Sequence, residues 1–234
     1  PLPPSEQFDR WLAEHWAYSG LNVVFIHFEL NRSLMLDRRM ARQANIPRRD
    51  LKTGLLTPEQ EQAYHAANER LRQWPGSITY VHTPGWTMEK AMTEVQALTA
   101  AGICDVFIID YLEKAMPSER QLKTYGSNPF AREADAVETV KRTAEAIERP
   151  ALLLAQLNKS AKQANFEDLD RSGIRGAGEK TEKANIVILL HRDGSENPVI
   201  NVKIDKNTMG RCGSFQQYMH GARFLITDIQ RNGA

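Results

Sequence analysis

An apolar run that ends in a carboxylate constrains this chain more than any other stretch. Residues 106–109 are all large and apolar, and Asp110 follows them directly. Such a run is typical of a parallel strand that is buried on both faces. Because ligands of open α/β sheets bind at the carboxyl ends of parallel strands, we expect Asp110 to lie at a functional edge. The alternative is a carboxylate that only caps the next turn.

Helices and strands alternate up to residue 156, and strands alone follow. Further parallel strands are predicted over Asn22–Leu30, Ser77–His82 and Ala151–Gln156. Helices are predicted from Ser5, over Leu34–Ala44, from Thr57, from Thr87 to Gly102 and over Phe130–Glu148. The late strands are predicted near Ile186–His191, Val199–Asp205, Ser214–Tyr218 and Arg223–Ile229. This order predicts an α/β fold with a mainly parallel central sheet, helices on both faces and an antiparallel extension at the C-terminal end.

Polar side chains stand at the ends of three predicted strands. Glu29, Asp110 and Gln156 occupy these positions. If the strands are neighbours, two carboxylates and an amide meet at one edge, which suits phosphoryl transfer: one carboxylate for a metal, one to orient water and an amide to sense the γ-phosphate. Two long predicted loops, Ala115–Pro129 and Leu157–Lys183, support a functional interpretation, since long loops in compact domains are commonly functional.

Length and composition limit the number of domains and the kinds of partner that this chain can have. A chain of 234 residues is the size of a single α/β domain, so we expect one domain over residues 1–234. The net charge of +1 means that any nucleic-acid site has to be local. Two cysteines are too few for a disulfide framework, and no apolar segment is long enough to cross a membrane. We therefore expect a cytoplasmic protein without a membrane partner.

Several segments carry a resemblance to a known family, namely NVVFIHFEL, DVFIIDYLEK, ALLLAQLNKS, RGAGEKTEKANIVILLHRD and IDKNTMGRCG. In this order, they resemble the RecA-like motor domain of DnaB-type hexameric replicative helicases, a P-loop ATPase fold. The resemblance implies ATP and Mg²⁺ as cofactors. It implies that Glu29 activates water, that Asp110 belongs to the Mg²⁺ site and that Gln156 reports the γ-phosphate. It also implies that Lys206 reaches the ATP of an adjacent subunit.

The chain departs from that family in two places. The family's glycine-rich loop, which ends in Gly-Lys-Thr or Gly-Lys-Ser, is missing together with the strand before it, and residues 3–6 stand about where the loop ends. Either the loop lies outside this sequence, or nucleotide binding is lost. Furthermore, Thr208 stands where the family places an arginine after Lys-Asn, and a threonine cannot replace a guanidinium. Arg211 either substitutes from the same turn or is a solvated turn residue.

The second long loop is the predicted DNA-binding segment. Its cations and glycines let side chains and backbone amides approach phosphates. The predicted DNA-contacting residues are Lys159, Lys162, Arg175, Gly176 and Gly178, with Lys180 as a further cation of the loop. A competing register, that is, another alignment of the loop with the family's DNA-contacting stretch, places the contact at Arg171, Ser172 and Gly173. A third possibility is a charged loop that is only solvated and does not bind DNA. Few aromatic side chains lie nearby, so contact with the backbone of a DNA strand is favoured over contact with its bases.

These observations leave two functional hypotheses. The first is an ATP-dependent replicative helicase motor that moves along single-stranded DNA as a ring and unwinds duplex. The second is a non-hydrolysing RecA-like module that keeps ring assembly and DNA contact. Because a site completed by a neighbouring subunit requires head-to-tail contacts, a homo-oligomer, hexameric in the parent protein, is expected. A primase or a helicase loader is the further partner that the resemblance suggests.

Overall fold

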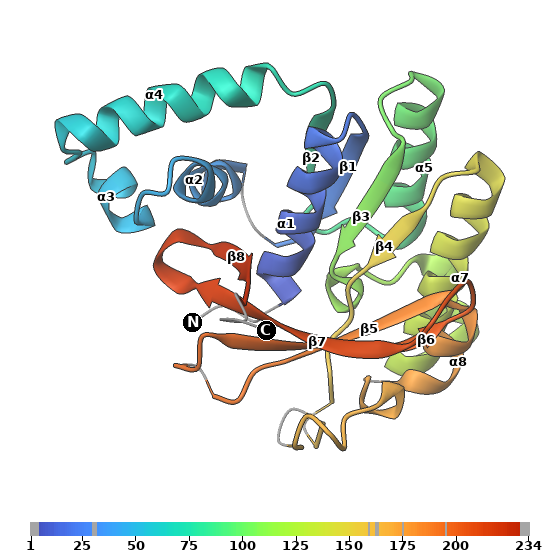
Figure 1. The fold of residues 1–234 in the computed structure, drawn as a ribbon. Helices are drawn as coiled ribbons and strands as arrows, with labels where there is room; N and C mark the ends of the chain where they lie inside the picture. The colour runs from blue at the N-terminus through green and yellow to red at the C-terminus, as the bar shows by residue number, and fades with distance from the viewer. Residues whose placement is uncertain are drawn as a thin grey trace.

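The chain folds into two four-stranded sheets with helices packed around them (Figure 1). The structure is a computed structural model, and it describes residues 5–29, 32–158, 160–161, 164–174, 176–194 and 196–229. Within these residues, no helix has the length and apolar character needed to cross a bilayer.

The first sheet is entirely parallel. Its strands run in the order β2 (Ser77–His82), β1 (Asn22–His27), β3 (Val106–Asp110) and β4 (Ala151–Leu153). Strands β1 and β3 are in the middle, and all residues of β3 are buried. The apolar run therefore forms the doubly buried strand that the sequence predicts.

Helices cover both faces of the parallel sheet (Figure 1). Alternate residues of β1 and β3 point to opposite faces, as the strand period requires. One face, with Ile26 and Ile109, packs against α5 (Met88–Ala100) and α7 (Pro129–Ile147). The other face, with Phe25 and Ile108, packs against α1 (Ser5–Tyr18) and α2 (Arg32–Gln43).

The antiparallel strands form a sheet of their own beyond the parallel one. They follow chain order: β5 (Ile186–His191), β6 (Val199–Asn207), β7 (Gly213–His220) and β8 (Leu225–Asp228). Their apolar side chains, including Ile200 and Val202, pack on Phe8 of α1. Helix α1 therefore lies between the two sheets, since its Ala13 and Ala17 contact the parallel sheet (Figure 1).

Local capping explains several helix starts. Thr57 and Gln60 form a capping box at the start of α4 (Pro58–Arg72), and Thr87 caps α5, as predicted. Gly20 takes a φ of 100° just after α1, where the sequence predicts the stop.

Both predicted loops contain helices, so their prediction as irregular segments is wrong. Helix α6 (Glu119–Tyr125) lies in the first loop, where Ser118 and Gln121 form a capping box. The second loop holds the short helix η2 (Arg171–Gly173) and α8 (Ala177–Lys183). Short helices α3 (Arg48–Thr53), η1 (Leu112–Lys114) and η3 (Gly221–Arg223) were also not predicted.

Candidate functional site

Strands β1, β3 and β4 are neighbours, so the predicted convergence of their ends holds. His27 of β1 is paired in register with Asp110 of β3, and Ile109 is paired with Leu153 of β4. Glu29 follows β1 and Gln156 follows β4, both at the carboxyl edge of the parallel sheet. This edge is where open α/β sheets bind ligands.

Glu29 lies in contact with solvent, held by two donors. Its side chain is 51% exposed, the Tyr111 hydroxyl donates to its Oε2 at 3.3 Å, and Lys114 Nζ lies 3.3 Å from its Oε1. Burial raises the pKa of the Tyr111 phenol, and the negative charge of Glu29 adds to the rise. The phenol therefore stays a donor at neutral pH. A solvent-facing carboxylate in this position is able to accept a hydrogen bond from a water molecule.

Asp110 has a different environment, because a buried arginine faces it. Arg10 Nη2 lies 3.4 Å from Asp110 Oδ2, and the two side chains are only 1% and 5% exposed. Arg10 comes from the second turn of α1, a helix whose chemical role was not predicted. The sequence gives no signal of it, because Arg10 shares a helical face with Gln7 and Glu14 and such a polar face looks solvated; in the structure all three are buried.

The residues around Asp110 do not fit a magnesium ion as they lie. Magnesium takes near-octahedral oxygen ligands and retains several waters, so it needs an accessible carboxylate. Asp110 is nearly closed to solvent and already paired with a guanidinium. In the part of the chain that the structure describes, no group of three or more His, Cys, Asp or Glu residues is placed to hold a metal ion.

A second buried pair fixes α1 to α2. Arg42 Nη2 donates to Glu14 Oε1 at 2.5 Å, and Arg42 Nε lies 3.2 Å from both carboxylate oxygens. Burial opposes the charged guanidinium, but the charge of Glu14 outweighs it and raises the pKa of Arg42. Both ends of this pair are buried, so α1 is held by charge as well as by apolar contacts.

The strand end at Gln156 is tied to α8 through a buried ion cluster. The backbone N–H of Gln156 donates to Glu113 Oε1 at 3.2 Å. Lys180 Nζ of α8 lies 3.5 Å from the same oxygen and 2.7 Å from Oε2 of Glu133 in α7. Lys180 is 5% exposed, so its predicted place among the cations of a DNA-facing loop is wrong. Its pairing links elements that are distant in sequence, which no local pattern reveals.

Three of the five predicted DNA-contacting residues lie outside the described residues. They are Lys159, Lys162 and Arg175, so their contacts stay predictions. Gly176 has a φ of +65° and precedes α8, and Gly178 lies exposed in its first turn.

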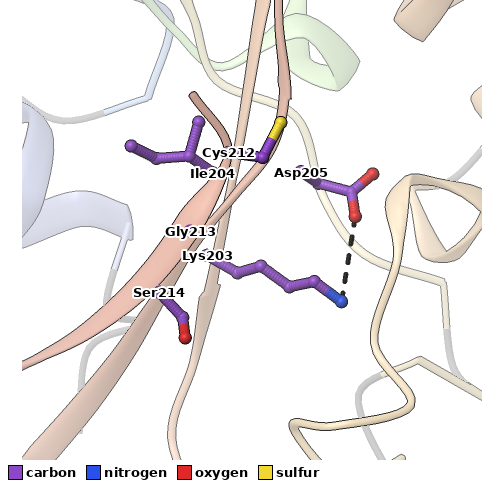
Figure 2. A pocket seen from close by; sticks show the side chains of 6 residues that line it. All are labelled: Lys203, Ile204, Asp205, Cys212, Gly213 and Ser214. Atoms are coloured by element: carbon purple, nitrogen blue, oxygen red, sulfur yellow. Dashed lines mark ion pairs between the residues drawn. The ribbon is translucent and has the colours of Figure 1, made fainter. Parts of the chain in front are cut away.

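Arg171, in the competing register, is held by the second sheet. Its backbone N–H donates to Asp205 Oδ2 at 3.2 Å, and its Nε lies 3.4 Å from the same oxygen. Lys203 Nζ lies 3.8 Å from the other oxygen of Asp205, as Figure 2 shows beside a small pocket of about 220 Å³. Cys212 and Ser214 also line this pocket. Asp205 therefore anchors the η2 turn to β6.

The two residues considered for contact with the ATP of an adjacent subunit lie at the β6–β7 hairpin. Lys206 Nζ donates to the backbone carbonyls of Thr181 and Glu182, both at 2.9 Å, and so caps the C-terminus of α8 within the same chain. Arg211 is exposed in the turn, and its carbonyl accepts a hydrogen bond from Asn207 Nδ2 at 3.2 Å. A contact with an adjacent subunit stays a prediction for both.

An arginine-lined cleft of about 620 Å³ lies beside the first turn of α1. Its wall includes Gln7, one carboxylate, Glu196, and three arginines, Arg38, Arg48 and Arg192. The Arg38 guanidinium lies 5.3 Å from the ring centre of Phe224, which also lines the cleft. The sequence showed these cations, but only the fold brings them together from α2, α3 and the turn after β5.

Comparison with known proteins gives a consistent set of relatives. Over 201 residues the chain is 27% identical to replicative DNA helicase DnaB of Geobacillus stearothermophilus, which covers 83% of this chain and 43% of that protein. It is 25% identical over 200 residues to replicative DNA helicase DnaC of Bacillus subtilis, covering 82% of this chain and 42% of that protein. The chain therefore spans less than half the length of these relatives.

Solved structures share the fold. One solved ATPase domain superposes with a TM-score of 0.82 at 16% identity, over 96% of this chain and 80% of that one. A DnaB-like replicative helicase, solved in a study of its interactions with primase, superposes with a TM-score of 0.79 at 16% identity. The superposition covers 92% of this chain and 52% of that chain. These likenesses confirm the predicted RecA-like α/β fold. The profile of the DnaB-like helicase C-terminal domain matches residues 7–225, and the chain therefore belongs to that family.

Proposed function

We propose that this chain is the motor domain of a replicative DNA helicase, which moves along single-stranded DNA as part of a ring and unwinds duplex with the energy of ATP. Membership of the DnaB-like family supports this proposal. The observation that carries it is the adjacency of β1, β3 and β4, which brings Glu29, Asp110 and Gln156 to one sheet edge. In the proposal Glu29 orients the attacking water, and Gln156 senses the γ-phosphate.

The arginine-lined cleft supports nucleotide binding. Its three arginines, Arg38, Arg48 and Arg192, suit the negative charge of a polyphosphate, although Arg48 also lies 3.8 Å from Asp37 and the lining includes one carboxylate, Glu196. Bound ATP supplies the phosphoryl group whose transfer drives movement. The family also implies Mg²⁺, but the surroundings of Asp110 do not fit it as they lie, so we assign no step to magnesium.

The DNA contact is proposed for the loop before α8. In this proposal Lys159, Lys162 and Arg175 approach phosphates, and Gly176 and Gly178 leave room for the backbone of the strand. Lys206 and Arg211 at the β6–β7 hairpin would face the neighbouring subunit of the ring. Because a similar structure describes a DnaB-like helicase and its interactions with primase, a primase contact is part of the proposal.

Binding of a fluorescent single strand tests this function. Arg175→Ala should weaken binding about equally for oligo(dT) and oligo(dA), and should flatten the logarithmic salt dependence by roughly one unit. Arg171→Ala is the matched control, since Asp205 holds that side chain, and it should change binding much less. A larger loss with Arg171→Ala would assign the contact to the other register. No loss with either would leave the loop an ordinary solvated surface.

A non-hydrolysing module is the second candidate function, and a specific observation favours it. The Asp110 carboxylate, which the family resemblance assigns to the Mg²⁺ site, is paired with Arg10. Such a module would keep ring assembly and DNA contact. DNA-stimulated ATP turnover by the parent protein distinguishes the two: turnover that Glu29→Gln abolishes supports the motor, and its absence supports the module.

A further inference from the structure

The carboxylate at the end of the central strand already has a cation of its own. Arg10 Nη2 lies 3.4 Å from Asp110 Oδ2, and neither side chain has appreciable contact with solvent. The guanidinium reaches the strand end from α1, which lies between the two sheets. A permanent positive charge is thereby built in beside Asp110, since arginine stays protonated in proteins.

A divalent ion and this guanidinium compete for the same carboxylate. A metal bound to Asp110 would lie within a few ångströms of Arg10, where two positive charges repel strongly in a poorly solvated site. The ion would also lose much of its hydration shell, because Asp110 is nearly closed to water. Metal binding at Asp110 therefore requires Arg10 to leave.

The packing of α1 resists such a departure. Glu14, one turn further along the helix, is locked to Arg42 of α2. Phe8 is buried against the antiparallel sheet, and Ala13 is buried against the parallel sheet. The helix that carries Arg10 is thus fixed on two sides, and the Arg10 side chain, at 1% exposure, is closed off from bulk solvent.

We infer that Arg10 takes the place of a divalent cation at Asp110, so that this chain binds nucleotide without a metal on that carboxylate. The inference rests on the proposed nucleotide site, and it makes the arrangement at Asp110 a property of this chain that its family membership does not predict. The arginine neutralises Asp110 permanently, whereas a metal would arrive and leave with the nucleotide.

Electron paramagnetic resonance of Mn²⁺ bound to the whole chain tests the inference, because Mn²⁺ is a paramagnetic substitute for Mg²⁺. Wild-type protein and Asp110→Asn should bind Mn²⁺ equally weakly. Arg10→Gln should bind at least about tenfold more tightly, because the repulsion is removed. Adding Asp110→Asn to Arg10→Gln should abolish that gain. Arg42→Gln combined with Glu14→Gln is the matched control: it removes a buried arginine–carboxylate pair involving the same helix without freeing a carboxylate, and it should leave Mn²⁺ binding at the wild-type level.

Two results would overturn the inference. One is tight Mn²⁺ binding by the wild type that Asp110→Asn removes. The other is a folded Arg10→Gln protein that gains no Mn²⁺ affinity. If Arg10→Gln does not fold, the comparison of wild type with Asp110→Asn still decides. Oligo(dT) binding measured on the same samples keeps the proposed function separate, since loss of DNA binding bears on that function and not on the metal.

Discussion

Replacement of Lys180 by methionine should strongly destabilise the protein. Lys180 is 5% exposed and lies 2.7 Å from Glu133 and 3.5 Å from Glu113, two carboxylates whose side chains are only 12% and 6% exposed. Methionine keeps most of the side-chain volume but removes the charge, which leaves both carboxylates buried without this cation. Removing one partner of a buried ion pair costs about 3–5 kcal/mol.

That cost translates into a measurable melting shift. A domain of 150–250 residues loses roughly 2–4 °C per kcal/mol, so we expect the midpoint to fall by about 6–20 °C. Differential scanning calorimetry at neutral pH measures the shift. Lys183→Met is the matched control, because Lys183 on the same helix pairs with Glu138 of the same α7 but is 36% exposed. It should melt close to the wild type.

Removing the charges of both carboxylates should restore stability. If the cost arises from unpaired carboxylates, Glu113→Gln and Glu133→Gln added to Lys180→Met should recover much of the lost stability. Two results would refute the view that this ion cluster holds α8 to the strand end. One is a Lys180→Met protein that melts like the wild type, and the other is a triple variant that melts no higher than the single one.

Two further outcomes follow from other parts of the fold. Burial alone would raise the pKa of Asp135, but hydrogen bonds from Arg120 and Gln121 outweigh it and hold the pKa below its ordinary value. The stability that Asp135 contributes is therefore present at neutral pH and is lost as the pH falls below about 4. Asp135→Asn should therefore melt lower than wild type at pH 7, and the difference should shrink as the pH falls below about 4. A constant difference would contradict this. Lys206→Ala should cost about 1–2 kcal/mol in urea unfolding, because two carbonyls at the end of α8 lose their donor; an unchanged midpoint would show that the cap is unimportant.

Local sequence patterns identified most of the elements that build the site. The apolar run before Asp110 is a buried parallel strand because its period and composition allow little else. Thr57 and Thr87 start helices because a side-chain oxygen and a free backbone amide suffice for a cap. Helix α6 was not predicted, although Ser118 and Gln121 form a capping box at its start. In each case the deciding interaction is close in sequence.

The polar chemistry of the site was harder to predict, because its partners are far apart in the chain. Arg10 meets Asp110 across 100 positions, and Lys180 meets Glu113 across 67. Before the fold is known, an arginine on α1 and a lysine in a charged segment look like solvated side chains. Only the packing of α1 between two sheets, and of α8 against α7, turns them into buried ion pairs.

Native mass spectrometry of the chain with oligo(dT) and a non-hydrolysable ATP analogue tests whether this domain assembles on single-stranded DNA. We expect complexes in which several copies share one oligonucleotide, built by head-to-tail contacts that place the β6–β7 hairpin of one copy against its neighbour. Such complexes should form at high protein concentration and weaken with added salt. A chain that stays monomeric under these conditions, or that assembles without taking up the oligonucleotide, would contradict the proposal that this domain works as a ring on single-stranded DNA.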